Sequence, residues 1–156
     1  MNNCLLYAVS QLTGIGYDNC QSLIGHDGEE LINDNRRGYH IQEVITKVLL
    51  PRGYLLTPLE VLPASRWPGG ILQVVILDKV YGQYEQIPEA VIEDRMRTLL
   101  DLAPCAIVEG MTARGVGHAY AKVLDTYYDQ HGQYTWNDIV AKEFICHCIW
   151  RLDRNG

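Results

Sequence analysis

A histidine that follows two glycines is the feature that most constrains this chain. Gly115-Val116-Gly117 leads into an alternating segment that begins at His118, and a second segment returns to Asp129. If the turn falls at Leu124-Asp125, the two polar side chains are diagonal neighbours on one face of an antiparallel hairpin, with Cα atoms roughly 7–8 Å apart. A three-residue turn would place them on opposite faces. We therefore predict a β-hairpin that pairs an imidazole with a carboxylate.

Length and composition indicate an ordinary globular protein. The chain has 156 residues, 47% of them hydrophobic, and we expect one domain over residues 1–156. A net charge of -6 argues against a nucleic-acid partner. No apolar run approaches ~18 residues, so no membrane span is expected. The N-terminus shows no secretion signal and the five cysteines have no framework spacing, so we expect reduced thiols in a cytoplasmic protein.

The periodicity predicts helices first and strands later, which is an α+β class with an antiparallel sheet. A helix beginning at Cys4 is expected to end at Thr13 to Gly16, and Pro58 is expected to cut a short strand. The other predicted helices are 18–24, 39–50 and 88–100. The predicted strands are 54–57, 105–109, 118–124 and 144–152, and residues 71–77 are expected to form a buried strand or a helix fragment. The predicted loops are 29–37, 63–70, 78–86 and 110–117.

Cys4 is the candidate nucleophile. Asn3 is a good N-cap residue, which places Cys4 in the first helical turn. There the helix dipole and the N–H groups without intrahelical partners favour a thiolate. A small apolar residue on a buried helix face would give the same pattern.

A thiol nucleophile needs a base, and the base needs a third group to orient it. His118 is the candidate base, because the flanking glycines let a substrate approach the backbone closely. Asp129 is the candidate third member. Asp125, Asn137 and Asp138 are the rivals for that role, and the hairpin register decides between them.

The motifs resemble those of papain-like cysteine peptidases and deamidases, in which a helix-start cysteine precedes a histidine and a carboxylate on late strands. The segment Asn2-Asn3-Cys4-Leu5-Leu6-Tyr7-Ala8 is similar to the nucleophile motif of ovarian-tumour-type deubiquitinases. The segment Gly117-His118-Ala119-Tyr120-Ala121, with Tyr128-Asp129 after it, resembles papain-fold toxins, bacterial deamidases and bacteriocin-leader peptidases. The resemblance implies N-terminal helices packed on an antiparallel sheet, a phage or bacterial source, and a protein or peptide substrate.

The resemblance also implies an oxyanion hole. Papain-like enzymes often use a glutamine several residues before the nucleophile, and only three residues precede Cys4 here. The expected donors are therefore the Cys4 backbone N–H and the side chain of Asn2 or Asn3, or of a residue from elsewhere in the chain. With these donors, the chain would hydrolyse a peptide, isopeptide or glutamine amide bond. Without them, it would be an inactive papain-fold binding module that engages a host protein.

We expect no metal and no cofactor. Cys146-His147-Cys148, with Cys20, His26 and His131, offers zinc-ligand types. In a regular strand, however, Cys146 and Cys148 face one way and His147 the other, which suits a tetrahedral site poorly. His26-Asp27 and His40 are expected to be turn and helix-cap residues, with the lining of a substrate groove as the alternative.

Overall fold

The computed structural model describes residues 3–29, 31–32, 35–36, 38–60 and 89–154. Its helices are α1 (Cys4–Thr13), α2 (Tyr17–Ile24), α3 (Ile41–Val44), the π-helical η1 (Ile45–Leu49), the 3-10 helix η2 (Leu50–Arg52), α5 (Glu89–Asp101) and α6 (Trp136–Ala141). Its strands are β1 (Leu31–Ile32), β2 (Asn35–Arg36), β3 (Tyr54–Glu60), β4 (Cys105–Met111), β5 (Gly117–Val123), β6 (Thr126–Asp129), β7 (Gly132–Tyr134) and β8 (Ile145–Arg154).

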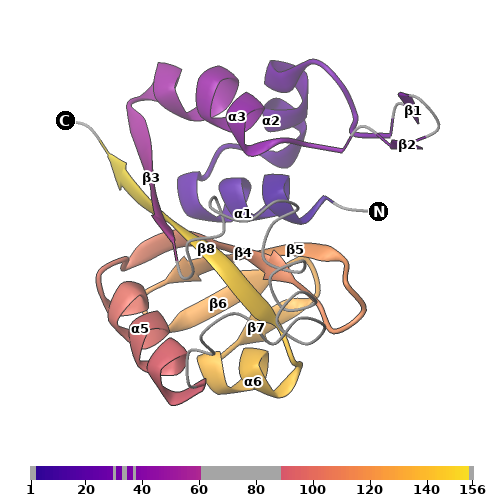
Figure 1. Cartoon of the computed structure of the whole chain (residues 1–156). Helices are drawn as coiled ribbons and strands as arrows, with labels where there is room; N and C mark the ends of the chain where they lie inside the picture. Colours follow the sequence, from indigo (N-terminus) through magenta and orange to yellow (C-terminus); the bar gives the residue numbers. More distant parts are fainter. Residues whose placement is uncertain (1–2, 30, 33–34, 37, 61–88, 155–156) are drawn as a thin grey trace.

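The main sheet has the order β3-β8-β4-β5-β6-β7, and every neighbouring pair is antiparallel. The N-terminal helices cover one face, and α5 and α6 cover the other (Figure 1). Each face has its own hydrophobic core. The predicted α+β class with an antiparallel sheet is confirmed. The predicted strand or helix fragment 71–77 and the loops 63–70 and 78–86 lie outside the described residues.

Helix α1 is fixed by the face that it buries. Leu6 and Val9 are almost fully buried, and they belong to the same core as Ala119 and Ala121 of β5. Burial of each large apolar side chain contributes about 1.5–3 kcal/mol, and the small alanines let the helix approach the strand closely. The packing therefore brings the start of α1, at Cys4, next to the start of β5.

The β5–β6 hairpin has the register on which the predicted pairing depended. Val123 lies opposite Thr126, so the turn consists of Leu124 and Asp125 alone. The same register places Asp129 diagonally across from His118, on one face of the hairpin. The sequence prediction of a two-residue turn is confirmed.

Two predicted boundaries were wrong. Pro58 does not cut β3, which continues to Glu60 with Pro58 opposite Trp150. Because β3 is the edge of the described sheet, a residue without an N–H is tolerated there. The predicted loop 29–37 contains the short strands β1 and β2.

A second set of differences concerns capping. The Asn3 side chain makes no cap hydrogen bond, although the residue stands at the N-cap of α1. Helix α6 was not predicted, and a capping box starts it: the Thr135 hydroxyl accepts from Asp138 N, and the Asp138 carboxylate accepts from Thr135 N.

The pairing of β4 with β8 contains a β-bulge. Glu109 lies opposite Cys148 and Gly110 lies opposite Cys146, so His147 is an extra residue. The expected alternation of Cys146 and Cys148 against His147 is therefore wrong: Cys146 is buried beneath α5 and α6, while His147 and Cys148 are partly exposed. Gly110 was expected in a loop but lies in β4, where a Cβ atom would collide with the backbone oxygen of Ile145.

The turn residue Leu124 gives a test of the hairpin. Its φ is 53°, a left-handed conformation that disfavours a leucine side chain by about 1 kcal/mol. Leu124→Asn should raise the free energy of unfolding by up to about that amount, because asparagine tolerates this conformation. Urea unfolding measures the change. Leu102→Asn is the control, because Leu102 is also exposed but has an ordinary negative φ, and an equal gain there would contradict the turn assignment.

Candidate active site

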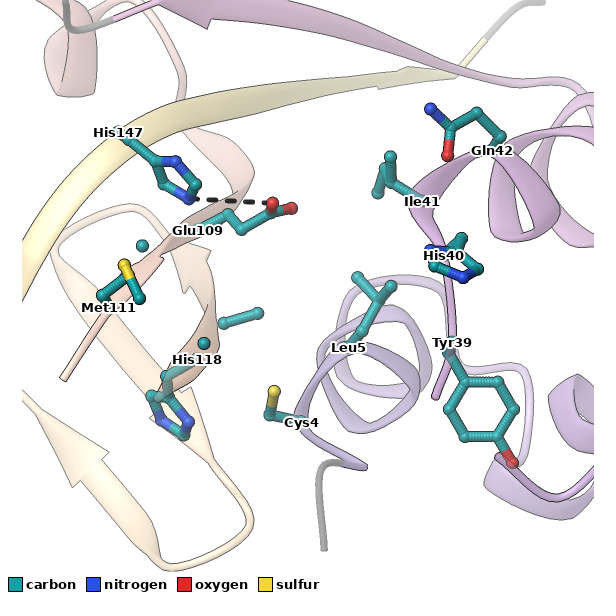
Figure 2. Close-up of a pocket in the computed structure, with 13 residues that line it drawn as sticks. Cys4, Leu5, Tyr39, His40, Ile41, Gln42, Glu109, Met111, His118 and His147 are labelled. Carbon is teal, nitrogen blue, oxygen red and sulfur yellow. Dashed lines mark ion pairs between the residues drawn. The ribbon is translucent and has the colours of Figure 1, made fainter. Parts of the chain in front are cut away.

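A cleft of about 360 Å³ lies where α1, the start of α3 and the strands β4, β5 and β8 meet. Cys4 enters it from the first turn of α1, and His118 enters it from the start of β5 (Figure 2). Tyr39, His40, Ile41 and Gln42 form the facing wall. The structure thus brings the predicted nucleophile and the predicted base to one cavity.

The environment of Cys4 differs from the sequence-based expectation of a thiolate. Burial raises the pKa of the Cys4 thiol, and the nearby Glu109 carboxylate also raises it. Backbone hydrogen bonds with Ala119, Leu5 and Cys4 itself lower the pKa but do not outweigh burial. Cys4 is only 4% exposed and belongs to the N-terminal core. Cys4 therefore lies in the first turn of a helix and also on a buried face. Desolvation of the thiol by burial has the largest effect on its pKa.

His118 contacts the predicted carboxylate. Its Nε2 atom lies 3.1 Å from Asp129 Oδ2, and the two side chains are 15% and 4% exposed. Because a carboxylate accepts, Nε2 carries the proton and donates it to Asp129. The Nδ1 atom is then the acceptor of the neutral ring. The predicted Asp129 contact is present, whereas the expected hydrogen-bond distance between Cys4 and His118 stays a prediction.

Asp129 is held from several sides. Its Oδ1 atom accepts hydrogen bonds from His131 N at 2.8 Å, Gly132 N at 3.1 Å and Tyr134 Oη at 3.2 Å. These bonds fix the β6–β7 turn and aim Oδ2 at His118. The carboxylate is thus a buried structural anchor as well as a partner of the imidazole.

The three rivals for the third role lie elsewhere. Asp125 is exposed in the β5–β6 turn, Asn137 is exposed on α6, and Asp138 caps that helix. Among the side chains that the structure describes, Asp129 is the carboxylate recorded against His118.

The ring of His118 is confined and neutral. Tyr120 packs edge-on against it at a centroid distance of 4.5 Å, and Phe144 does so at 6.5 Å. Burial lowers the pKa of His118, contact with Asp129 raises it, and the nearby His131 and Lys142 side chains lower it further. A lowered histidine pKa beside a raised thiol pKa indicates a neutral thiol and a neutral imidazole at pH 7.

Among the predicted oxyanion donors, Cys4 lines the cleft, so its backbone N–H remains a candidate. Asn2 lies outside the described residues, and Asn3 is not among the described residues that line the cleft. Gln42 and His40 line the facing wall and offer side-chain donors that sequence reasoning did not assign to this role. His40 thus combines the two roles considered for it, because it is also the N-cap residue of α3.

Glu109 and His147 are cleft residues that the sequence did not reveal. Glu109 Oε1 lies 3.8 Å from His147 Nε2, and Glu109 Oε2 accepts a hydrogen bond of 3.2 Å from Trp150 Nε1. Both line the cleft near Cys4 because of the bulge that makes His147 the extra residue of β8. No periodicity signals such a bulge in advance, and a lone glutamate in an apolar strand was the only available hint.

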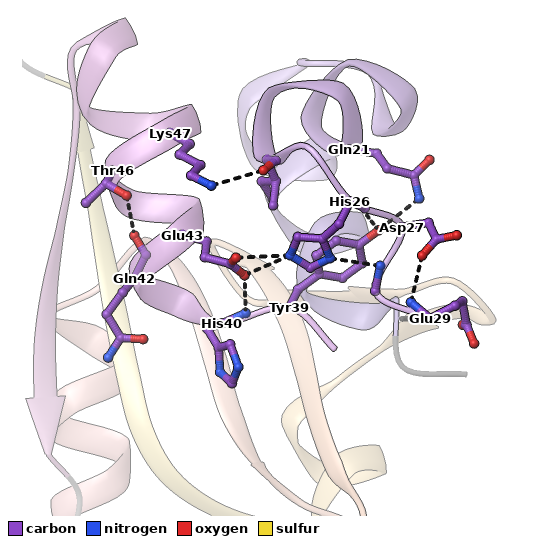
Figure 3. A network of polar contacts seen from close by, with 12 residues as sticks. Gln21, His26, Asp27, Glu29, Tyr39, His40, Gln42, Glu43, Thr46 and Lys47 are labelled. Atoms are coloured by element: carbon purple, nitrogen blue, oxygen red, sulfur yellow. Dashed lines mark hydrogen bonds and ion pairs between the residues drawn. The ribbon is translucent and has the colours of Figure 1, made fainter. Parts of the chain in front are cut away.

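A polar network holds the facing wall in place (Figure 3). His26 Nε2 contacts both Glu43 oxygens, at 3.0 and 3.2 Å, and His26 Nδ1 accepts from Gly28 N. The His26 ring also stacks on Tyr39, and Gly28 has φ +74° at a site where a Cβ atom would press on the Tyr39 ring. Because both ring nitrogens are engaged, His26 serves to position the wall and is not available as a base.

Comparisons with known proteins return no match: no family model, curated protein or solved structure is similar to this chain. Within the described part of the chain, each helix is too short or too polar to cross a bilayer.

His118 makes stability depend on pH. Its folded-state pKa is lowered, whereas an unfolded histidine titrates at about 6.5. The unfolded chain therefore binds more protons below about pH 7, and the contribution of this group to the free energy of unfolding falls as the pH drops from 7 to 5. Urea unfolding between pH 7 and pH 5 should show that the free energy of unfolding falls less for His118→Gln than for the parent protein. Equal slopes would contradict the assignment.

Asp129 should matter for folding as well as for the site. Asp129→Ala removes the shared acceptor of two backbone N–H groups of the β6–β7 turn and of the Tyr134 hydroxyl, and should lower the free energy of unfolding by about 2–3 kcal/mol. Asp129→Asn keeps an acceptor for the turn and should cost clearly less. Urea unfolding of both variants measures the difference. A fully stable Asp129→Ala protein would show that the turn does not depend on this carboxylate.

Proposed function

We propose that the chain is a papain-like cysteine hydrolase that acts on a peptide, isopeptide or glutamine amide bond through Cys4, His118 and Asp129. The observation that carries the proposal is the shared cleft: a helix-start cysteine faces a histidine whose far nitrogen is bound to a buried carboxylate. The packing of α1 on β5 supports the resemblance to papain-like domains that the sequence motifs suggested.

The proposed reaction begins with the neutral pair. His118 Nδ1 takes the proton of the Cys4 thiol as the sulfur attacks the carbonyl carbon of the substrate. The C–N bond then breaks, and the same proton passes to the leaving amine or ammonia. Water, deprotonated by His118, attacks the resulting thioester and regenerates the thiol. Asp129 keeps Nε2 protonated and stabilises the imidazolium formed in each half-reaction.

The first turn of α1 supplies one oxyanion donor in this proposal. The backbone N–H of Cys4 lies at a helix start, where N–H groups have no intrahelical acceptor. A second donor has to come from another cleft residue, and the amide of Gln42 and the imidazole of His40 are the candidates on the facing wall. Preorganised donors of this kind typically account for about 10²–10³ in rate each.

Two observations favour the second candidate function, a papain-fold binding module without turnover. The raised pKa of Cys4 and the absence of Asn3 from the cleft are both unfavourable for a thiol enzyme. The pH dependence of Cys4 alkylation does not separate the two candidates, since a neutral thiol can still react through His118. Turnover has to be measured directly.

Variants of the three residues test the hydrolase. Cys4→Ala and His118→Ala should each abolish turnover, because nucleophile and base act as one unit. Asp129→Asn should keep a small residual rate, because its amide NH₂ forces the wrong tautomer on His118 without removing the nucleophile. The measurement is mass spectrometry of a peptide and protein library, which separates addition of water across a backbone bond from conversion of glutamine to glutamate.

Two control variants change the same residue types outside the proposed site. Asp125→Asn changes an exposed turn carboxylate near the same hairpin and should leave turnover unchanged. Cys105→Ala removes a partly exposed thiol outside the cleft and should also be silent. Loss of turnover in Asp125→Asn with full activity in Asp129→Asn would show that Asp125, and not Asp129, orients His118. Library hydrolysis that survives Cys4→Ala would reject the proposed nucleophile, and no hydrolysis by the parent protein would favour the binding module.

A further inference from the structure

The described part of the cleft lining contains one carboxylate, and its recorded ion-pair partner is a histidine. Among the described residues that line the cleft, Glu109 is the only carboxylate, and none is a lysine or arginine. The Glu109 side chain is 33% exposed, and Figure 2 shows its carboxylate pointing toward the wall that carries His40 and Ile41. The titratable groups that face it from the other elements are Cys4, His40, His118 and His147, with Tyr39 farther along the wall.

The two oxygens of the Glu109 carboxylate have different partners. Trp150 Nε1, a neutral donor, holds Oε2 at 3.2 Å. Oε1 lies 3.8 Å from His147 Nε2, which is beyond hydrogen-bond distance. The bulge at His147 directs this pair into the cleft, and bulges beside active sites commonly re-aim a side chain in this way. Trp150 therefore fixes one oxygen, while the other lies within ion-pair range of His147 and borders the cleft.

This charge works against the proposed chemistry until something compensates it. A negative charge close to Cys4 disfavours both the thiolate and the oxyanion that forms on the substrate, and the raised pKa of Cys4 reflects part of that effect. A cation bound to Glu109 would remove the penalty and leave the reacting atoms otherwise untouched. Substrate charge and nucleophile reactivity would then be coupled through Glu109.

We propose that Glu109, with His147 beside it, forms a subsite for a positively charged substrate group, the guanidinium or ammonium of an arginine or lysine side chain next to the bond that Cys4 attacks. This specificity rests on the proposed hydrolase function. The cation pairs with Glu109 Oε1, and Trp150 keeps the carboxylate in position. The bound cation both selects the substrate and activates Cys4.

The subsite can be tested without a known substrate. The probe is the ethylguanidinium ion, its neutral isostere is ethylurea, and the readout is the rate at which neutral iodoacetamide alkylates Cys4 at pH 7. Ethylguanidinium should accelerate Cys4 alkylation about threefold or more, the order expected when one nearby charge is neutralised, and ethylurea should not. Peptide mass spectrometry follows each thiol separately, with Cys105 as the internal reference.

Glu109→Gln is the decisive variant, because the amide oxygen can still accept from Trp150. It should alkylate about threefold faster than the parent protein without any additive, and ethylguanidinium should have no further effect. Glu93→Gln makes the same charge change at an exposed position on α5 and should behave like the parent protein. Absence of acceleration in the parent protein, or acceleration that persists in Glu109→Gln, would overturn the subsite.

Measurements of turnover test the cation subsite at Glu109 and the hydrolase function separately. Paired peptides that differ only in arginine or the neutral citrulline should show a preference for arginine in kcat/KM, and Glu109→Gln should abolish it. A Glu109-dependent alkylation effect without hydrolysis of any peptide would reject the hydrolase and keep the cation site. Hydrolysis with equal rates for both peptides would keep the hydrolase and reject the subsite.

Discussion

The site depends on how closely α1 can approach β5. Leu6 and Val9 press against a strand whose inward positions are the alanines Ala119 and Ala121, so helix and strand lie near each other along their length. The helix begins where the strand begins, and this places Cys4 beside the residue that follows His118. Larger side chains on β5 would push the helix away and open the cleft, although neither alanine carries any chemistry. The reactive residues are therefore positioned by neighbours that are chemically inert.

Local signals in the sequence were sufficient for much of this arrangement. The helix that bears Cys4, the two-residue turn at Leu124 and Asp125 and the diagonal contact of His118 with Asp129 follow from periodicity and pleat geometry, and all three are present. The bulge at His147 and the passage of β3 through Pro58 were missed, because each depends on which strand lies alongside. The direction of the Cys4 pKa shift could not be predicted from the sequence either, because desolvation depends on the side chains that surround Cys4 in the folded protein.

Asp129 and Glu109 show how two carboxylates of one cleft region take different roles. Asp129 is 4% exposed and accepts four hydrogen bonds, so its charge is compensated inside the protein and its orientation is fixed. Glu109 is one-third exposed and has one neutral donor at hydrogen-bond distance. Asp129 can only orient His118, because its carboxylate is buried and a substrate cannot contact it. In the proposed subsite Glu109 pairs with a cation of the substrate, so the electrostatics around Cys4 change when the substrate binds.

The edge strands of the described sheet affect whether copies of the chain associate with one another. An exposed edge strand invites another chain to add to the sheet, and proteins protect such edges with proline or by keeping them short. At one edge β3 carries Pro58, which has no N–H to offer an incoming strand, and at the other β7 has only three residues. The proline that was expected to end a strand thus protects its edge, and a Pro58→Thr chain would regain a backbone N–H at that edge and should self-associate more readily in a concentrated solution.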